Sequence, residues 1–274
     1  MAKVRKDKRG RNLHKGEYQR PDGRYAYAYR YNGKRVFIYD TDLASLRKKE
    51  QQTQADLIDG IRTYESSRLT LNDLFQVYME TKTNLKESTE SNYRYLWEHY
   101  IQHEPIAKKA LSKIHKSDVK LLYAKLLQEG FASNSLESIN NLIHPVLELA
   151  VDDDLIRKNP SNGVYREMKT NAPVQRIALT SEQAKHFLQY IESSPQYCSW
   201  LPLFVTLLGT GMRASECTGL VWDDIDFENN CIHVDHALIY RSIHGNAKWY
   251  ISTLKTRNSV RTIPMISAVA QQLN

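Results

Sequence analysis

The residues best suited to chemistry lie in one short segment, between Gly209 and Asp226. Gly209 and Gly211 permit a sharp turn, after which Arg213 begins a predicted helix with Glu216 one turn later on the same face. A helix start offers free backbone N–H groups, so an arginine there is suited to hold a phosphate, and a glutamate could orient it. An ordinary exposed Arg–Glu pair has the same spacing, and spacing by itself favours that simpler interpretation.

A second segment, Leu254 to Pro264, reads as a turn between two strands. We expect a hairpin with Lys255 at its rim, where the ammonium group could reach into a groove as a point charge or a proton donor. Exposed hairpin lysines more often protect a sheet edge, so this segment alone is a weak indication of function.

Together the two segments resemble the tyrosine recombinase (integrase) family, whose members cut and rejoin DNA through a phosphotyrosine. Residues 211–226 follow the family pattern G-hydrophobic-R-x-S-E-x-x-x-L-x-W-x-D-I-D, and residues 255–264 follow K-T-x-x-S-x-R-x-I-P. The helical segment ending at residues 150–160 resembles the family's core-binding domain. The basic N-terminal segment resembles the arm-binding domain of integrases from conjugative transposons, so the resemblance covers nearly the whole chain.

The resemblance implies a role for three residues. Arg213 would hold the scissile phosphate and neutralise the charge that develops in the transition state. Lys255 would be the general acid that protonates the departing 5′ oxygen, and Glu216 would orient the active site from behind. No metal and no cofactor are implied, because arginine and lysine here take the electrostatic role that cations take in two-metal nucleases.

The sequence also departs from the family pattern. Family members continue with an H-x-x-R box, a further His or Trp, and the nucleophilic tyrosine. The last histidine here is His244 and the last tyrosine is Tyr250, and both precede Lys255. We therefore expect residues 1–274 to resemble a recombinase cut off after the first half of its catalytic domain and not to cleave DNA alone. The sequence is consistent with an enzyme and with a protein that binds DNA without catalysis.

Charge is concentrated at one end of the chain. The 274 residues carry a net charge of +7, but residues 1–35 hold 12 Lys and Arg against 3 acidic residues. This basic end predicts a polyanion partner, with double-stranded DNA ahead of a membrane, although a solubilising tail would have the same composition. The chain has no long apolar run and no secretory signal pattern, and its three cysteines lie far apart, so we expect a cytoplasmic protein.

The N-terminal segment predicts a three-stranded antiparallel sheet followed by a helix. Tyrosines alternate with small and basic residues over residues 24–31, Asn32-Gly33 is a preferred hairpin turn, and residues 17–20 and 35–39 supply the outer strands. Asp40 or Thr41 would cap a helix that runs to about residue 59.

The two faces of this sheet have different expected partners. We expect the tyrosines to pack on the helix and the opposite face, with Arg24, Ala26, Ala28 and Arg30, to suit a DNA groove. The alternative is a tyrosine platform that stacks the bases of RNA or single strands. The candidate DNA-contacting residues of this segment are Arg20, Arg24, Arg30, Lys34 and Arg35.

Four amphipathic helices are expected next, and they predict a compact bundle. Their expected first residues or caps are Thr70, Thr89, Ser117, and Ser133 or Asn134. Pro145 lies inside the fourth pattern and predicts a kink or a break. Thr89 and Lys116 are candidate phosphate contacts, although scattered polar residues on helices are usually just solvated.

The remaining chain predicts a partial mixed α/β domain. Residues 63–68 read as a joint and residues 165–173 as a linker. Beyond the linker we expect a strand at 176–179, helices at 180–191 and 196–208, and strands at 231–240, 249–254 and 261–265. The fold class is therefore α+β and multidomain, with an arm-type DNA-binding domain at 1–62, a core-binding helical domain at 68–164 and part of a catalytic domain at 174–274.

One further pair could suggest a metal site. His233 and His236 are three residues apart in a predicted strand, where positions i and i+3 point to opposite faces, so no metal site is expected from this pair. The sequence thus predicts a DNA integration and recombination protein that binds duplex DNA at arm and core sites and can self-associate on DNA. The alternatives are a non-catalytic competitor for integration sites and, less well supported, an RNA-binding protein.

Overall fold

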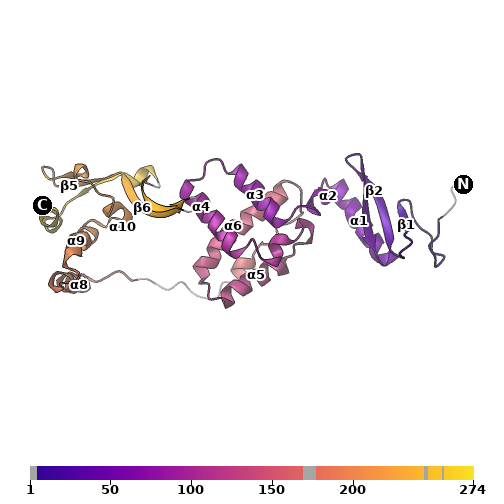
Figure 1. Ribbon diagram of the computed structural model, residues 1–274, viewed down its shortest axis with the longest axis horizontal. Helices are drawn as coiled ribbons and strands as arrows, with labels where there is room; N and C mark the ends of the chain where they lie inside the picture. The colour runs from indigo at the N-terminus through magenta and orange to yellow at the C-terminus, as the bar shows by residue number, and fades with distance from the viewer. Residues whose placement is uncertain (1–4, 169–176, 244–245, 255) are drawn as a thin grey trace. The chain divides into compact units, whose positions relative to one another are not determined.

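The computed structural model describes residues 5–168, 177–243, 246–254 and 256–274. The chain forms two compact units, residues 1–173 and residues 174–274 (Figure 1). Each unit has its own hydrophobic core, and the first unit contains both a small sheet and a helical bundle.

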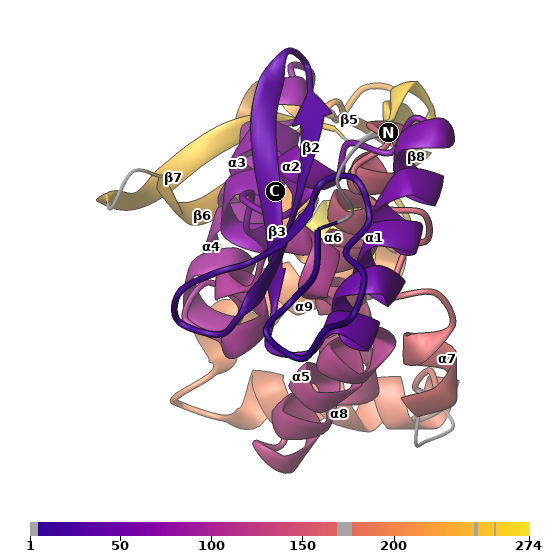
Figure 2. The same cartoon turned by 90° about the vertical axis from the view of Figure 1, so that its right-hand side faces the viewer.

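The small sheet begins the first unit. Strands β1 (Glu17–Gln19), β2 (Tyr25–Tyr31) and β3 (Lys34–Asp40) are antiparallel in the order β1-β2-β3, and helix α1 (Leu43–Ile58) lies against one face (Figures 1 and 2). Tyr25 and Tyr27 are buried against Leu43 and Leu46 of this helix. The prediction that the tyrosines pack on the helix is thus confirmed for these two strand positions.

Two details of this sheet differ from expectation. The helix cap is Asp42, whose carboxylate accepts the Ser45 backbone N–H at 3.0 Å, rather than Asp40 or Thr41. Ala26 is fully buried although it lies on the face away from the helix, because its register partners on the two neighbouring strands are Tyr18 and Tyr39. That face is therefore aromatic and basic, not small and basic.

The helical bundle completes the first unit, and its helices enclose a single core. Leu142, Ile143, Val146 and Leu147 are fully buried within it. The elements are α2 (Thr63–Ser66), α3 (Leu71–Thr81), α4 (Glu87–Tyr100), η1 (Pro105–Lys108), η2 (Leu111–Lys113), α5 (Lys116–Gln128), α6 (Ser133–Asp152) and α7 (Val164–Met168). Thr70 caps α3 as predicted, in a capping box with Asp73.

Several predicted boundaries in the bundle are wrong. Helix α4 begins two residues before Thr89 and α5 one residue before Ser117. The segment predicted as a joint, 63–68, contains α2, and the segment predicted as a linker, 165–173, overlaps α7. Helix α6 continues through Pro145 without a break. The apolar stripe on both sides of this proline is buried in the core, and that burial outweighs the lost backbone hydrogen bond.

The second unit contains α8 (Ser181–Ser193), η3 (Cys198–Trp200), α9 (Leu201–Thr210), α10 (Ala214–Cys217), η4 (Trp222–Asp224) and α11 (Ser267–Leu273). Its strands are β4 (Ile225–Asp226), β5 (Cys231–Val234), β6 (His236–Ile243), β7 (Asn246–Thr253) and β8 (Arg261–Pro264), with the short η5 (Arg257–Ser259) between the last two. Strands β4, β5 and β8 form one antiparallel sheet, and β6 and β7 form a separate antiparallel pair.

Three predictions for this unit are corrected. Residues 177–179 do not form a strand. The predicted long strand at 231–240 is divided at Asp235 into β5 and β6, which belong to different sheets. Strands β7 and β8 consequently pair with different partners, so the segment between them joins two sheets and is not a hairpin.

The described part of the chain contains no helix that is both long and apolar enough to cross a membrane.

Candidate active site and DNA-binding surfaces

Arg213 and Glu216 are joined by two hydrogen bonds at the start of α10. Gly211 ends α9 in the left-handed conformation (φ 65°), which sets the chain direction for Arg213. The Arg213 backbone N–H donates to Glu216 Oε2 at 3.0 Å, and its guanidinium Nη1 donates to Oε1 at 2.5 Å. Glu216 is buried, whereas the Arg213 side chain is 69% exposed. One end of the guanidinium is thus held by protein and the rest faces solvent.

Arg261 joins this pair from 45 residues further along the chain. Its Nη2 donates to Glu216 Oε2 at 2.8 Å, so one buried carboxylate holds two arginines. Burial by itself raises the pKa of Glu216, but the hydrogen bonds from Arg261 and Arg213 outweigh it and lower the pKa to about 2. Sequence reasoning assigned no role to Arg261, although the residue stands in the K-T-x-x-S-x-R-x-I-P pattern.

A cavity of about 380 Å³ lies over these arginines. It is lined by Gly211, Arg213, Asn258, Ser259 and Arg261, and so brings together the two segments that the sequence singled out. Two guanidinium groups beside a shared carboxylate form a site suited to a phosphate or another oxyanion. Lys255, the predicted general acid, lies outside the described residues.

His236 holds the chain just after α10, the helix that Arg213 precedes. Its Nε2 lies 2.8 Å from the carbonyl oxygen of Gly219, just after α10, and its Nδ1 lies 2.6 Å from Asp235 Oδ1. Asp235 and the Gly219 carbonyl both favour the protonated ring and raise the pKa of His236. A side chain at Gly219 would meet the Leu238 backbone nitrogen at 2.8 Å, so this glycine allows the close approach.

The outer face of the N-terminal sheet carries stacked aromatic and basic side chains. We call Tyr18, Phe37, Tyr39, Arg20 and Arg35 the aromatic–arginine face. Phe37 lies edge-on to Tyr18 and stacks on Tyr39, and the guanidinium groups lie 5.2 Å from ring centroids, Arg20 over Tyr39 and Arg35 over Phe37. This face combines positive charge with partly exposed rings.

The other predicted arm residues border this face. Arg30 is directly opposite Arg35 in the register of β2 and β3, and Lys34 begins β3. Arg24 donates to Asp22 at 2.8 Å. The guanidinium groups of Arg30 and Arg35 together give the end of this hairpin a dense positive charge.

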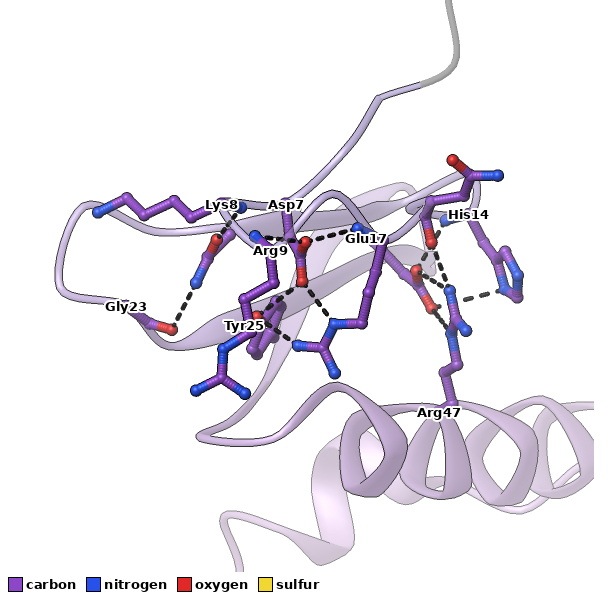
Figure 3. Close-up of polar contacts among 11 residues, drawn as sticks. Asp7, Lys8, Arg9, His14, Glu17, Gly23, Tyr25 and Arg47 are labelled. Carbon is purple, nitrogen blue, oxygen red and sulfur yellow. Dashed lines mark hydrogen bonds and ion pairs between the residues drawn. The ribbon is translucent and has the colours of Figure 1, made fainter.

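A buried polar network stabilises the small sheet (Figure 3). Glu17 has no exposed surface, and its carboxylate accepts Arg47 from α1 at 2.8 and 3.1 Å and the His14 backbone N–H at 2.7 Å. Asp7 accepts Arg11 at 2.8 Å and the Tyr25 hydroxyl at 2.9 Å. These contacts tie the N-terminal residues and α1 to the sheet that presents the aromatic–arginine face.

The two predicted contacts of the bundle lie at helix starts. Thr89 is half-buried in the first turn of α4. Lys116 begins α5, and its Nζ lies 2.5 Å from a Glu167 carboxylate oxygen. The lysine that was expected to contact phosphate is thus ion-paired with Glu167. A phosphate would have to displace the Glu167 carboxylate to bind Lys116.

Comparison with known proteins identifies the family. Residues 1–57 match the DNA binding domain of Tn916 integrase, and residues 178–274 match the phage integrase family. The chain is 30% identical over 285 residues to the transposase from transposon Tn916 of Enterococcus faecalis, an alignment that covers 99% of this chain and 69% of that protein. The chain belongs to the phage integrase family of tyrosine recombinases.

Other relatives agree with this family. The transposase from transposon Tn1545 of Streptococcus pneumoniae is 29% identical, again over 99% of this chain and 69% of that protein. A solved structure of the Tn1549 transposon integrase in complex with a circular intermediate DNA has a TM-score of 0.68 and 27% identity. That match covers 74% of this chain and 63% of the Tn1549 integrase chain. This recombinase chain therefore spans less than two thirds of the length of the solved Tn1549 integrase. A lambda integrase dimer bound to a core site, with a TM-score of 0.51 and 21% identity, shares the fold.

Proposed function

We propose that this protein takes part in site-specific DNA integration and recombination, with duplex DNA as its substrate. The single observation that carries the proposal is the cluster of Arg213 and Arg261 around buried Glu216, beside a cavity that opens to solvent. Such a cluster is a preorganised receptor for a phosphodiester. The Tn1549 integrase, a structural neighbour, was solved in complex with DNA, which supports the same substrate.

Three roles follow at this site. Arg213 binds the scissile phosphate, and Glu216 holds both arginines in place, with Lys255 as the acid that protonates the departing 5′ oxygen. Arg213 suits the first role because its guanidinium is anchored at one edge and exposed at the other.

The parts of the chain divide the DNA between them. Residues 1–62 bind arm sites through the aromatic–arginine face, Arg24, Arg30 and Lys34, and the match of residues 1–57 to the Tn916 domain supports this assignment. Residues 68–164, with Thr89 and Lys116, and residues 174–274 both bind the core site. The protein acts in the cytoplasm, where its DNA is, and associates with further copies on DNA.

Arg24 provides a test of the arm surface. Arg24→Ala should weaken binding to arm-site duplex DNA, because it removes a cation from the β1–β2 turn, beside the aromatic–arginine face. The matched control is Lys48→Ala on α1, which removes an equal charge from an exposed position of the helix. If fluorescence anisotropy gives the same affinity for Arg24→Ala and wild type, Arg24 is not part of the DNA-binding surface.

A suicide duplex substrate tests the chemistry of residues 1–274. Because the last tyrosine, Tyr250, precedes Lys255, we expect this polypeptide to bind the substrate without forming a covalent protein–DNA adduct. An adduct that survives denaturing electrophoresis would contradict this expectation. Binding without an adduct is also the behaviour of a competitor that occupies integration sites.

One observation favours a second function. Phe37 and Tyr39 are partly exposed beside two arginines, an arrangement that could stack unpaired bases. An RNA-binding protein would use the same face, and the choice of nucleic acid separates the two functions.

A further inference from the structure

A set of mixed metal-ligand side chains lies outside the arginine cluster. Asp226 ends β4, Cys231 begins β5 directly opposite it, and His233 follows two residues later. One ligand atom from each residue, a carboxylate oxygen, a thiol sulfur and a ring nitrogen, lie within 4.8 Å of one another. Side chains in a strand point alternately to its two faces, so Cys231 and His233, two residues apart, lie on the same face.

The groups around these three residues orient them toward one another. His233 Nδ1 lies 2.9 Å from the Thr262 hydroxyl on β8, and the other ring nitrogen, Nε2, lies 3.9 Å from Cys231 Sγ. When Nδ1–H donates to Thr262, Nε2 carries the lone pair that a metal needs. Asp226 Oδ1 accepts the backbone N–H of Asn229 at 2.8 Å and Oδ2 accepts its side-chain N–H at 2.7 Å, which orients the carboxylate and leaves each oxygen a second lone pair for a metal.

Two other clusters of potential ligands among the described residues are less suited to a metal, because one already holds a cation and the other has no free ring nitrogen. At His14, Glu17 and Glu50, the guanidinium of Arg47 holds the Glu17 carboxylate. Around His236, both ring nitrogens are taken up by Gly219 and Asp235. Among the three clusters found in the described residues, the Cys231 cluster is the one that offers a thiol and an imidazole nitrogen facing each other.

We propose that Asp226, Cys231 and His233 bind a zinc ion with water as the fourth ligand. Zinc accepts sulfur, nitrogen and oxygen ligands in tetrahedral geometry, whereas calcium and magnesium do not select thiolate. Zn–S and Zn–N bonds of about 2.3 and 2.0 Å imply a ligand separation of roughly 3.5 Å, so the observed 3.9 Å requires only a small side-chain rotation. Binding releases the Cys231 proton to solvent.

The bound ion would fasten the β4–β5 turn. The turn is already joined to β8 through the Met265 N–H, which donates to the Asn230 carbonyl at 2.7 Å. With Thr262 also on β8, a zinc ion in this place would reinforce all three strands of the sheet that carries Arg261. The site needs neither DNA nor an intact catalytic centre.

Cobalt(II) is the probe that tests this site, because a cobalt–thiolate bond gives a charge-transfer absorption in the near ultraviolet. Titration of the reduced full chain, without DNA, should give this band together with the visible bands of tetrahedral cobalt at one equivalent. Zinc should abolish both. Cys231→Ser should remove the thiolate band, and His233→Ala should weaken cobalt binding roughly tenfold or more.

Two variants make the test specific. Cys198→Ser removes an exposed thiol elsewhere in the same unit and should leave the cobalt spectrum unchanged. Thr262→Val should lower zinc affinity roughly tenfold, measured by competition with a chromophoric chelator, because it removes the partner that fixes the histidine tautomer. A wild-type protein without the thiolate band, or a band that survives in Cys231→Ser, would overturn the proposal. Circular dichroism of each variant distinguishes lost ligation from lost folding.

Discussion

At the scale of single residues, the candidate site depends most on Glu216. Its carboxylate accepts the Arg213 backbone, the Arg213 side chain and Arg261, and its pKa falls from the ordinary 4.5 to about 2. Removing the charge leaves two neighbouring guanidinium groups without their shared partner. Glu216→Gln should therefore lower the local free energy of opening by on the order of 2 kcal/mol.

Hydrogen exchange of the backbone amides of residues 213–220 measures this loss. Since the folded pKa is depressed, the charge contribution is present above pH 4.5 and disappears as pH falls toward 2, whereas Glu216→Gln lacks this dependence. Glu192→Gln removes an exposed carboxylate of α8 and serves as the control. Equal protection in wild type and Glu216→Gln at pH 7 would show that Glu216 does not hold the segment.

At the scale of elements, His236 couples the end of α10 to the start of β6. Two acidic groups face the ring, Asp235 in direct contact and Asp224 at 3.8 Å, while Gly219 contributes a carbonyl oxygen. The pKa of His236 is raised above its ordinary 6.5, so its stabilising contribution is complete below pH 6.5 and is lost as pH rises through the folded pKa. Protection of residues 214–222 should fall over that range.

His236→Ala should abolish this pH dependence and leave protection low throughout. The control is His186→Ala, which removes an exposed histidine of α8. Exchange rates corrected for intrinsic chemistry between pH 5.5 and 8.5 provide the measurement. The same pH profile in His236→Ala and wild type would assign the effect to another group.

The sequence predicted elements where one periodic pattern dominated. The alternating tyrosines gave the sheet and its packing on α1, and Thr70 with Asp73 gave a helix start. Caps with several adjacent polar candidates were missed, because Asp40, Thr41 and Asp42 differ little in capping free energy until the sheet fixes the chain direction. Ala26 was placed on the correct face, but its burial depends on rings from two neighbouring strands.

Of the candidate site, local sequence patterns predicted the contacts between neighbouring residues but not those between distant ones. The local spacing of Arg213 and Glu216 is visible within four residues, and their side chains are hydrogen-bonded in the structure. Arg261 reaches the same carboxylate only through the pairing of β5 with β8, which local sequence does not encode. The predicted hairpin at Lys255 was wrong because strand pairing, again a long-range property, divides its two strands between sheets.

At the scale of the whole molecule, polar contacts of Arg157 help to join the small sheet domain to the bundle within the first unit. Arg157, after α6, contacts Asp56 of α1 at 2.6 Å and Asp59 at 2.5 Å, and the Arg62 N–H donates to the Asp154 carbonyl at 2.7 Å. Arg157→Ala should loosen this joint only slightly, because the ion pairs are exposed to solvent and weakened by it. Trypsin should then cleave faster after Arg62.

The neighbouring Lys158→Ala controls for the loss of one charge, since Lys158 is exposed. Raising the salt concentration should accelerate cleavage of the wild type toward the Arg157→Ala rate, and affect the variant less. Identical cleavage rates for wild type and Arg157→Ala at low salt would mean that the ion pairs do not hold the two parts together.

The central claim is that this recombinase chain recognises duplex DNA. A competition experiment followed by fluorescence anisotropy tests this claim most directly. The full chain is bound to a labelled mixed-sequence duplex of about 30 base pairs. Unlabelled duplex, or single-stranded RNA of the same sequence, then displaces the labelled duplex. We predict roughly tenfold stronger competition by the duplex, an affinity that falls steeply with salt, and weaker duplex binding by Arg30→Ala and Arg35→Ala. Stronger competition by the RNA would contradict the claim and assign the aromatic–arginine face to unpaired bases.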